Sequence, residues 1–202
     1  MKLLYTIILT ALSSMTMQSF AQSPLQSLRQ MFSSGAVAIE ADYEMNLHEA
    51  PIVGASDVIV QGNMYYMKGN GLDVYCNGKS MWTIDDSAME VVIESCDADD
   101  KDYLANPLLI LVDLDSLFEI KSQKVVDDCT SYTLVAVADC GVTKATLLLT
   151  SKGTIRSAKF QLEDGSTLAV KVSSMKKTEE KPASFFSPQR KFGSDWIVTD
   201  LR

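Results

Sequence analysis

The sequence predicts a mainly β protein with inserted helices: an incomplete, half-open antiparallel β-barrel covered by a short helical lid. Most of the chain after residue 36 consists of short stretches with an apolar residue at every second position. Turns such as Asn77-Gly78 and Asp164-Gly165 separate these stretches, as in hairpins. Only two segments have helical character, so they can cover just the mouth of a curved sheet. A cavity between sheet and helices and a fully packed core both fit this pattern.

The N-terminus has the features of an export signal. Lys2 supplies the positive charge, residues 3–12 are apolar, and Ser19-Phe20-Ala21 offers the small residues that a signal peptidase requires. The apolar stretch is too short to span a bilayer comfortably, which makes an uncleaved anchor the weaker alternative. We therefore expect cleavage after residue 21 and a single domain, residues 22–202, that is soluble in the periplasm. No cysteine follows the cleavage site, so the chain itself is not expected to be lipidated.

The charge of the chain argues against some partners. The chain has 18 Lys and Arg against 26 Asp and Glu, a net charge of −8, and loss of Lys2 brings the mature chain to −9. An acidic chain without a basic stripe is not suited to nucleic acid or to an anionic membrane surface. We expect a monomer that binds no nucleic acid.

The first helix and strand are predicted from a change of period. Ser23 can cap a helix that has Pro24 at its first position. One face of this helix is apolar and contains Leu25, Leu28 and Phe32. From residue 37 the apolar residues alternate instead, in the order Val37, Ile39, Ala41, Tyr43, Met45 and Leu47. This alternation predicts a strand with one wet face.

Further strands follow at short intervals. In the first half of the chain they are expected at residues 58–60, 64–67, 72–76, 80–84 and 89–94. An acidic loop at 97–102 and a helical insertion around residues 103–118, with Pro107 near its start, interrupt the series. Four more strands are expected at 131–138, 143–150, 155–162 and 167–173, followed by a solvated loop at 176–181 and an extended tail from residue 185, with all strands antiparallel.

The residue inventory does not support catalysis. His48 is the one histidine, and it ends a strand on the polar side without a neighbouring nucleophile. The acidic segment Asp97–Asp102 lacks the glycine and the closing glutamate of a calcium loop. No glycine-rich phosphate loop joins a strand to a helix. We therefore expect no enzyme activity, no metal and no cofactor.

Four cysteines, Cys76, Cys96, Cys129 and Cys140, permit two disulfides with three connectivities in an oxidising compartment. If residues 130–138 form one strand, Cys129 and Cys140 lie more than about 30 Å apart and cannot pair. A Cys96–Cys129 pair is the preferred hypothesis because both residues flank the helical insertion. Free buried thiols are the alternative, and the spacing does not match a zinc site.

Several motifs in order resemble the LolA-like family of outer-membrane lipoprotein carrier proteins. The hairpin Cys76-Asn77-Gly78-Lys79-Ser80-Met81-Trp82-Thr83-Ile84-Asp85 resembles a characteristic hairpin of that family. The other matching segments are Phe32 to Leu47, Asn106-Pro107-Leu108-Leu109, Gly153-Thr154-Ile155, Asp164-Gly165, Phe185-Phe186-Ser187-Pro188 and Trp196 to Arg202. Together they cover essentially the whole mature chain.

The resemblance implies a half-open barrel whose lid covers an apolar cavity. It also implies a function: accepting acylated lipoproteins from an inner-membrane lipoprotein-releasing transporter and passing them to an outer-membrane acceptor. One departure concerns the gating arginine that better-studied members carry in an Arg-Pro pair. This chain has Gln61-Gly62-Asn63 at that place, so the gating mechanism does not transfer.

A carrier of acyl chains needs an apolar and adaptable host. Hiding a chain of about sixteen carbons from water is worth at most about 13 kcal/mol. Methionine suits such a surface because it is unbranched and polarizable, although core filling is the alternative for each methionine. The residues that we expect in the cavity or lid are Leu28, Phe32, Val37, Ile39, Tyr43, Met45, Val58, Val60, Met64, Tyr66, Val74, Trp82, Leu108 and Leu111. Trp82 could equally plug the bottom of the barrel.

A second function belongs to a different class. The same fold could serve as a periplasmic lipid-binding module, or as an interaction module that senses envelope stress without transporting lipoproteins. An interaction module would usually have an added partner-binding domain, for which we expect no room in this chain, and the signal segment suits a soluble carrier, so the sequence favours the carrier.

Overall fold

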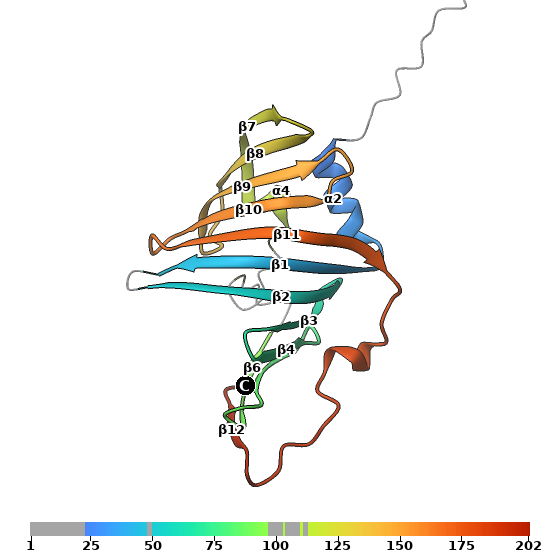
Figure 1. Cartoon of the computed structure of the whole chain (residues 1–202), viewed down its shortest axis with the longest axis vertical. Helices are drawn as coiled ribbons and strands as arrows, with labels where there is room; N and C mark the ends of the chain where they lie inside the picture. Colours follow the sequence, from blue (N-terminus) through green and yellow to red (C-terminus); the bar gives the residue numbers. More distant parts are fainter. Residues whose placement is uncertain (1–22, 48–49, 97–102, 104–109, 111–112) are drawn as a thin grey trace, which may run out of the picture.

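The computed structural model describes residues 23–47, 50–96, 103, 110 and 113–202. The predicted signal segment, the acidic loop at 97–102, and Leu108 and Leu111 lie outside the described residues. Within the described part, all strands belong to a single sheet that is strongly curved and not closed into a barrel (Figure 1). The predicted fold class, an incomplete antiparallel barrel with short helices over its mouth, is therefore confirmed.

The sheet has twelve strands in the order β12-β6-β5-β4-β3-β2-β1-β11-β10-β9-β8-β7. Their bounds are β1 Ala36–Asn46, β2 Pro51–Gln61, β3 Met64–Gly69, β4 Leu72–Cys76, β5 Ser80–Asp85, β6 Glu90–Ser95, β7 Phe118–Val126, β8 Cys129–Ala136, β9 Val142–Thr150, β10 Ile155–Leu162, β11 Thr167–Thr178 and β12 Ile197–Asp200. The chain starts in the middle at β1 and meanders outward to β6. It then re-enters at the opposite edge with β7 and meanders back until β11 pairs with β1.

The two faces of the sheet can be followed through the strand register, because directly opposed residues point to the same side. Val37 on β1 lies opposite Val60 on β2, and Tyr43 lies opposite Val170 on β11. Helix α2 (Pro24–Ser33) packs on the side to which these residues point, as does the short helix α4 (Leu114–Leu117). We call this side the inner face and the opposite side the outer face.

Helix α2 begins as the sequence predicts. Ser23 has extended backbone dihedrals, and its Oγ accepts a hydrogen bond from the Gln26 N–H at 3.2 Å, which satisfies one of the free donors at the helix start. The buried residues of the helix are the predicted apolar face, Leu25, Leu28 and Phe32. This confirms the predicted helix and fixes its orientation towards the sheet.

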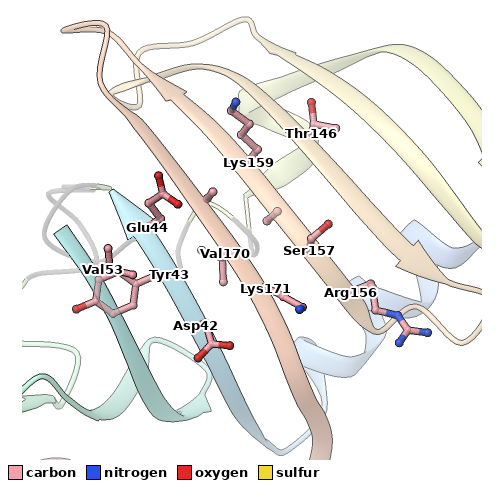
Figure 2. Close-up of a pocket in the computed structure, with 12 residues that line it drawn as sticks. Asp42, Tyr43, Glu44, Val53, Thr146, Arg156, Ser157, Lys159, Val170 and Lys171 are labelled. Carbon is pink, nitrogen blue, oxygen red and sulfur yellow. The ribbon is translucent and has the colours of Figure 1, made fainter. Parts of the chain in front are cut away.

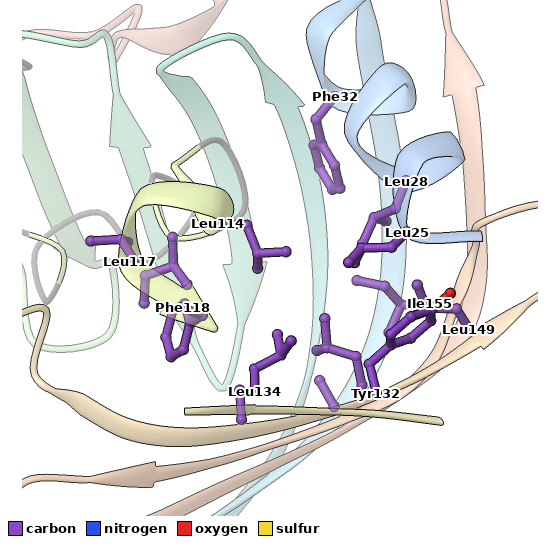
Figure 3. Packing of buried hydrophobic residues seen from close by; sticks show 14 of the residues in the cluster. Leu25, Leu28, Phe32, Leu114, Leu117, Phe118, Tyr132, Leu134, Leu149 and Ile155 are labelled. Carbon is purple, nitrogen blue, oxygen red and sulfur yellow. The ribbon is translucent and has the colours of Figure 1, made fainter. Parts of the chain in front are cut away.

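The main core fills the space between the two helices and the inner face (Figure 3). Leu114, Leu117 and Phe118 approach from one side and the α2 leucines from the other, over Tyr132 and Leu134 of β8. Leu147 and Leu149 of β9 are fully buried beneath them. The half of the barrel built from β8 to β10 is therefore packed with side chains.

The C-terminal arm, residues 179–202, crosses the molecule from the end of β11 to the far edge of the sheet (Figure 1). It contains a 3₁₀ turn, Ala183–Phe186, whose Phe186 is fully buried. The arm then covers an outer-face cluster in which Phe192 and Trp196 pack against Ile84, Val91 and Ile93. It ends as β12, which pairs with β6 in parallel.

Four expectations about elements are corrected. The structure adds β7 where a helix or loop was expected, and β2 starts at Pro51 rather than at residue 58. β11 continues to Thr178, because β1 offers partners as far as Ala36, so the expected loop at 176–181 is partly strand. The parallel β12–β6 pair contradicts the expectation that all strands are antiparallel.

Candidate functional site

One region of the inner face is apolar and only partly buried, and four of its residues, Ile39, Val58, Phe160 and Val170, pack against the main core. It is formed by β1, β2, β10 and β11, and its residues are Ile39, Tyr43, Met45, Ile52, Val58, Phe160, Leu168 and Val170. We call this set the inner apolar band. Ile52, at its rim, keeps 46% of its surface exposed.

The register shows that the inner apolar band is continuous across strands. Ile52 lies opposite Met45, Met45 opposite Leu168, and Leu168 opposite Phe160, which gives one apolar row across four strands. A second row runs through Tyr43 and Val170. Opposed side chains are about 5 Å apart at Cβ, so each row forms a contiguous surface.

A smaller cluster continues the inner face onto β3 to β6. Tyr65 and Val74 are buried there beside Cys76 and Cys96, and the flexible side chains Met67 and Met81 are partly buried against them. The Tyr65 hydroxyl contacts Met81 Sδ at 3.1 Å. Burial raises the pKa of Tyr65 above its ordinary value, so the phenol is neutral at physiological pH.

The structure places the expected lipid-binding residues in three groups. Ile39, Tyr43, Met45 and Val58 lie in the inner apolar band. Leu28, Phe32, Val37, Val60 and Val74 also face inward, but they are buried in clusters of side chains. The third group, Met64, Tyr66 and Trp82, lies on the opposite face of the sheet.

Met64, Tyr66 and Trp82 lie on the outer face and do not belong with the others. The two-residue turn Gly62-Asn63 sets Met64 opposite Gln61 and Tyr65 opposite Val60, so Tyr65 rather than Tyr66 points inward. Tyr66 instead packs on Tyr75, with ring centroids 4.7 Å apart, and against Phe185 of the arm. Trp82 joins the cluster beneath the arm and neither lines the inner face nor plugs the barrel.

Sequence reasoning missed several inward residues that the register identifies, namely Ile52, Tyr65, Phe160, Leu168 and Val170, and it left Met67 and Met81 open between cavity and core. The signal was present in the short hairpin turns, because a two-residue turn fixes which residues oppose each other. Counting outward from Val58 and Val60 across Gly62-Asn63 would have selected Tyr65 and Met67.

The place of the family's gating arginine has a different role here. The Gln61 side-chain amide binds the Lys181 backbone twice: its Nε2 donates to the Lys181 carbonyl at 3.1 Å, and its Oε1 accepts from the Lys181 N–H at 2.8 Å. Gln61 therefore fixes the start of the C-terminal arm at the end of β2.

A depression of about 570 Å³ lies on the other side of the sheet (Figure 2). Its lining includes the acidic side chains of Asp42 and Glu44 and the basic side chains of Arg156, Lys159 and Lys171. Asp42 lies opposite Lys171, both out of phase with the inward-pointing Tyr43 and Val170. The lining of the depression also includes apolar residues, among them Val53, Ala169 and Val170, so charged and apolar groups meet there.

The cysteines are arranged differently from the preferred hypothesis. Cys76 Sγ and Cys96 Sγ are 3.0 Å apart, which corrects the expected Cys96–Cys129 pair. Cys129 begins β8, which lies far from β6 in the strand order of the sheet, and its thiol contacts Asp128. All four cysteines are buried, and no disulfide joins them in the structure.

Two further observations apply to the described part of the chain. No three His, Cys, Asp or Glu side chains gather there in a way that could hold a metal ion. None of the helices described is long and apolar enough to cross a membrane.

The comparisons identify relatives by fold. No family model matches the sequence, and no curated protein matches it. Among solved structures, an uncharacterized conserved protein from Thermus thermophilus is 12% identical, covers 88% of this chain and 96% of its own, and has a TM-score of 0.55. A LolA superfamily protein from Nitrosomonas europaea is 15% identical, with coverages of 83% and 97% and a TM-score of 0.45.

A third similar structure is an outer membrane lipoprotein-sorting protein domain from Vibrio parahaemolyticus, 9% identical, with coverages of 80% and 94% and a TM-score of 0.41. At these identities the likeness concerns the fold, and function requires a separate argument.

Proposed function

We propose that this protein is an exported carrier that binds acyl chains of lipoproteins on the inner apolar band. The observation that supports this most directly is the band itself. It is a contiguous set of aliphatic and aromatic side chains on the inner face of an open sheet, partly buried against the main core at Ile39, Val58, Phe160 and Val170 and exposed at the rim residue Ile52. Contiguous exposed apolar surface of this kind marks a binding site in a soluble protein.

The chemistry of the band fits reversible binding. Each buried methylene of an acyl chain contributes about 0.8 kcal/mol, so a long chain can be held without any directional contact. Met45 in the band and Met67 and Met81 beside it can change rotamer to follow a mobile ligand. A surface of this type can bind an acyl chain and still release it.

The proposed clients are acylated lipoproteins, received from an inner-membrane releasing transporter and passed to an outer-membrane acceptor. The export signal at residues 1–21 and the acidic mature chain are compatible with a periplasmic carrier. Because Gln61 replaces the gating arginine and holds the arm, release here cannot use the arginine-based opening.

The test is displacement of an apolar, environment-sensitive dye from the purified protein. A triacylated lipopeptide, the same peptide without acyl chains, and a free fatty acid are titrated in turn. We expect the acylated lipopeptide to displace the dye far better than the fatty acid, and the bare peptide to have no effect. Equal displacement by both lipids would indicate a general lipid-binding module instead.

Consecutive residues of β2 provide a matched pair of variants. Ile52 faces inward and Val53 outward, and both are exposed, at 46% and 67%. We expect Ile52→Asn to weaken lipopeptide binding several-fold and Val53→Asn to leave it unchanged, because only Ile52 belongs to the band. If neither dye nor lipid binds the wild type, the carrier function is wrong and a non-transporting interaction module becomes the better hypothesis.

A further inference from the structure

Two cysteines that are distant in sequence meet on the inner face of the sheet. Cys76 ends β4, and Cys96 directly follows β6, the next strand but one. Their sulfur atoms are 3.0 Å apart, with 0% and 7% of the two residues exposed. A disulfide has an S–S distance of about 2.05 Å, so a shift of about 1 Å would join them.

The backbone holds both cysteines in place independently of their thiols. Asn77-Gly78 forms a tight turn after Cys76, in which Asn77 Oδ1 accepts hydrogen bonds from the N–H groups of Lys79 and Ser80. The Cys96 N–H donates to the Lys79 carbonyl of the same turn at 2.8 Å. One turn therefore positions both residues, and the contact between the thiols follows from hydrogen bonds of the main chain.

The remaining cysteines lack such a pairing. Cys129 starts β8 and Cys140 lies beyond its end, at least about 20 Å along an extended strand. Cys129 Sγ contacts Asp128 Oδ1, and Cys140 Sγ contacts the Val142 carbonyl. Each of the three possible connectivities needs two disulfides. The positions of the four cysteines are compatible with only one link, Cys76–Cys96.

We propose that Cys76 and Cys96 form the one structural disulfide of this protein, and that Cys129 and Cys140 stay reduced. The oxidant is the disulfide of a thiol–disulfide exchange partner such as oxidised glutathione. The two cysteine thiols lose two electrons and two protons and form the S–S bond, while the partner's S–S bond is reduced to two thiols. The bond forms during folding, because both thiols are enclosed by Tyr65, Met67 and Met81 afterwards.

The experiment starts from the full chain, reduced and unfolded, and refolds it in a glutathione redox buffer. Alkylation of the product under denaturing conditions counts free thiols, and peptide mapping without reductant locates the link. We expect two alkylated thiols, at Cys129 and Cys140, and a Cys76–Cys96 peptide pair. Four free thiols after refolding, or any other pairing, would overturn the proposal.

The effect of reductant on thermal stability shows whether the Cys76–Cys96 disulfide is structural. The link closes a loop between residues 20 apart in sequence. We expect reductant to lower the Tm of the refolded chain by roughly 5–10 °C. The double variant Cys129→Ser/Cys140→Ser should keep this response, and Cys76→Ser/Cys96→Ser should lose it. A reductant response that survives in the second variant would contradict the assignment.

The same thiol count on the chain isolated from whole cells that express it with residues 1–21 tests the proposed export separately. A link that forms on refolding but is absent from the cellular protein would mean that export is wrong, while the disulfide assignment stands. Absence under both conditions would mean that the disulfide assignment is wrong, and the dye experiment would still decide the carrier function.

Discussion

Gly153 shows how a single residue controls the fit between the sheet and a helix. It lies in the β9–β10 turn with φ +79°, a conformation that L side chains rarely adopt. A Cβ there would be 2.6 Å from both the Leu28 N and the Pro24 O of α2. The sequence indicates a turn at this place, but the contact with α2 depends on the tertiary structure.

We therefore expect Gly153→Ala to lower the free energy of unfolding more than a glycine-to-alanine substitution in a turn normally does. Gly165 is the matched control, because its φ is +86° and a Cβ added to it would meet no atom within 4 Å. Gly165→Ala should cost about 1 kcal/mol for backbone strain alone, and Gly153→Ala roughly 2–4 kcal/mol because α2 must move. Urea unfolding of both variants measures the difference, and equal losses would show that α2 does not dock on this turn.

A second residue-scale prediction concerns acid. Hydrogen bonds from the Arg202 side chain and backbone lower the pKa of Asp200 to about 2. Because the folded-state pKa lies below the unfolded value of about 3.9, the stabilisation from this pair is complete above that value and is lost as pH falls towards 2. We expect NMR titration to give Asp200 a pKa near 2, and Arg202→Gln to raise it towards its ordinary value. An unchanged pKa in the variant would exclude Arg202 as the cause.

At the scale of elements, local pattern predicts strands well where turn chemistry and alternation agree. β4 and β10 have the expected bounds and β5 extends one residue further than expected, to Asp85, because alternation and short turns mark all three strands. The sequence pattern did not predict β7, because this edge strand has nearly all its residues exposed and therefore lacks alternation. β12 depends on a long-range contact, in which the Ile197 N–H donates to the Met89 carbonyl.

The C-terminal arm is an element whose docking can be measured directly. Both tryptophans of the chain lie in the outer-face cluster, Trp82 on β5 beneath the arm and Trp196 in the arm itself. Arg190 stacks on Trp196, 4.7 Å from the ring centroid, and its Nη1 pairs with Asp86 at 2.6 Å. Tryptophan emission therefore reports on the arm and little else.

We expect Phe186→Ala to loosen the arm, because Phe186 is fully buried where the arm meets the sheet. The cost should be about 3–5 kcal/mol, as for other buried phenylalanines, and the emission of the folded variant should shift to the red as water reaches the indoles. Leu28→Ala is the control, since it removes an equally buried side chain from α2 and should lower stability without changing the emission. Identical spectra for both variants would mean that the arm stays docked without Phe186.

For the whole molecule, the two halves of the inner face differ in how far their side chains are covered. Helices α2 and α4 fill the side of β8 and β9, while the inner apolar band on β1, β2, β10 and β11 is only partly buried. Composition and alternation predicted an apolar concave face, but they could not distinguish packed from open regions. That division depends on where two short helices dock.

An open apolar band implies that ligand and fold are coupled. If an acylated lipopeptide binds only the folded chain, saturation at one hundred times Kd should add about 2.7 kcal/mol to the free energy of unfolding. For a chain of this size that corresponds to a Tm increase of roughly 5–11 °C, measured by thermal unfolding with and without lipopeptide. The Val53→Asn variant should show the full increase in Tm on lipopeptide binding. The Ile52→Asn variant should keep most of its own stability but show little of that increase. Ile52 is exposed, so its replacement removes contacts with the ligand rather than with the core. An equal increase in both variants would move the binding site away from the inner apolar band.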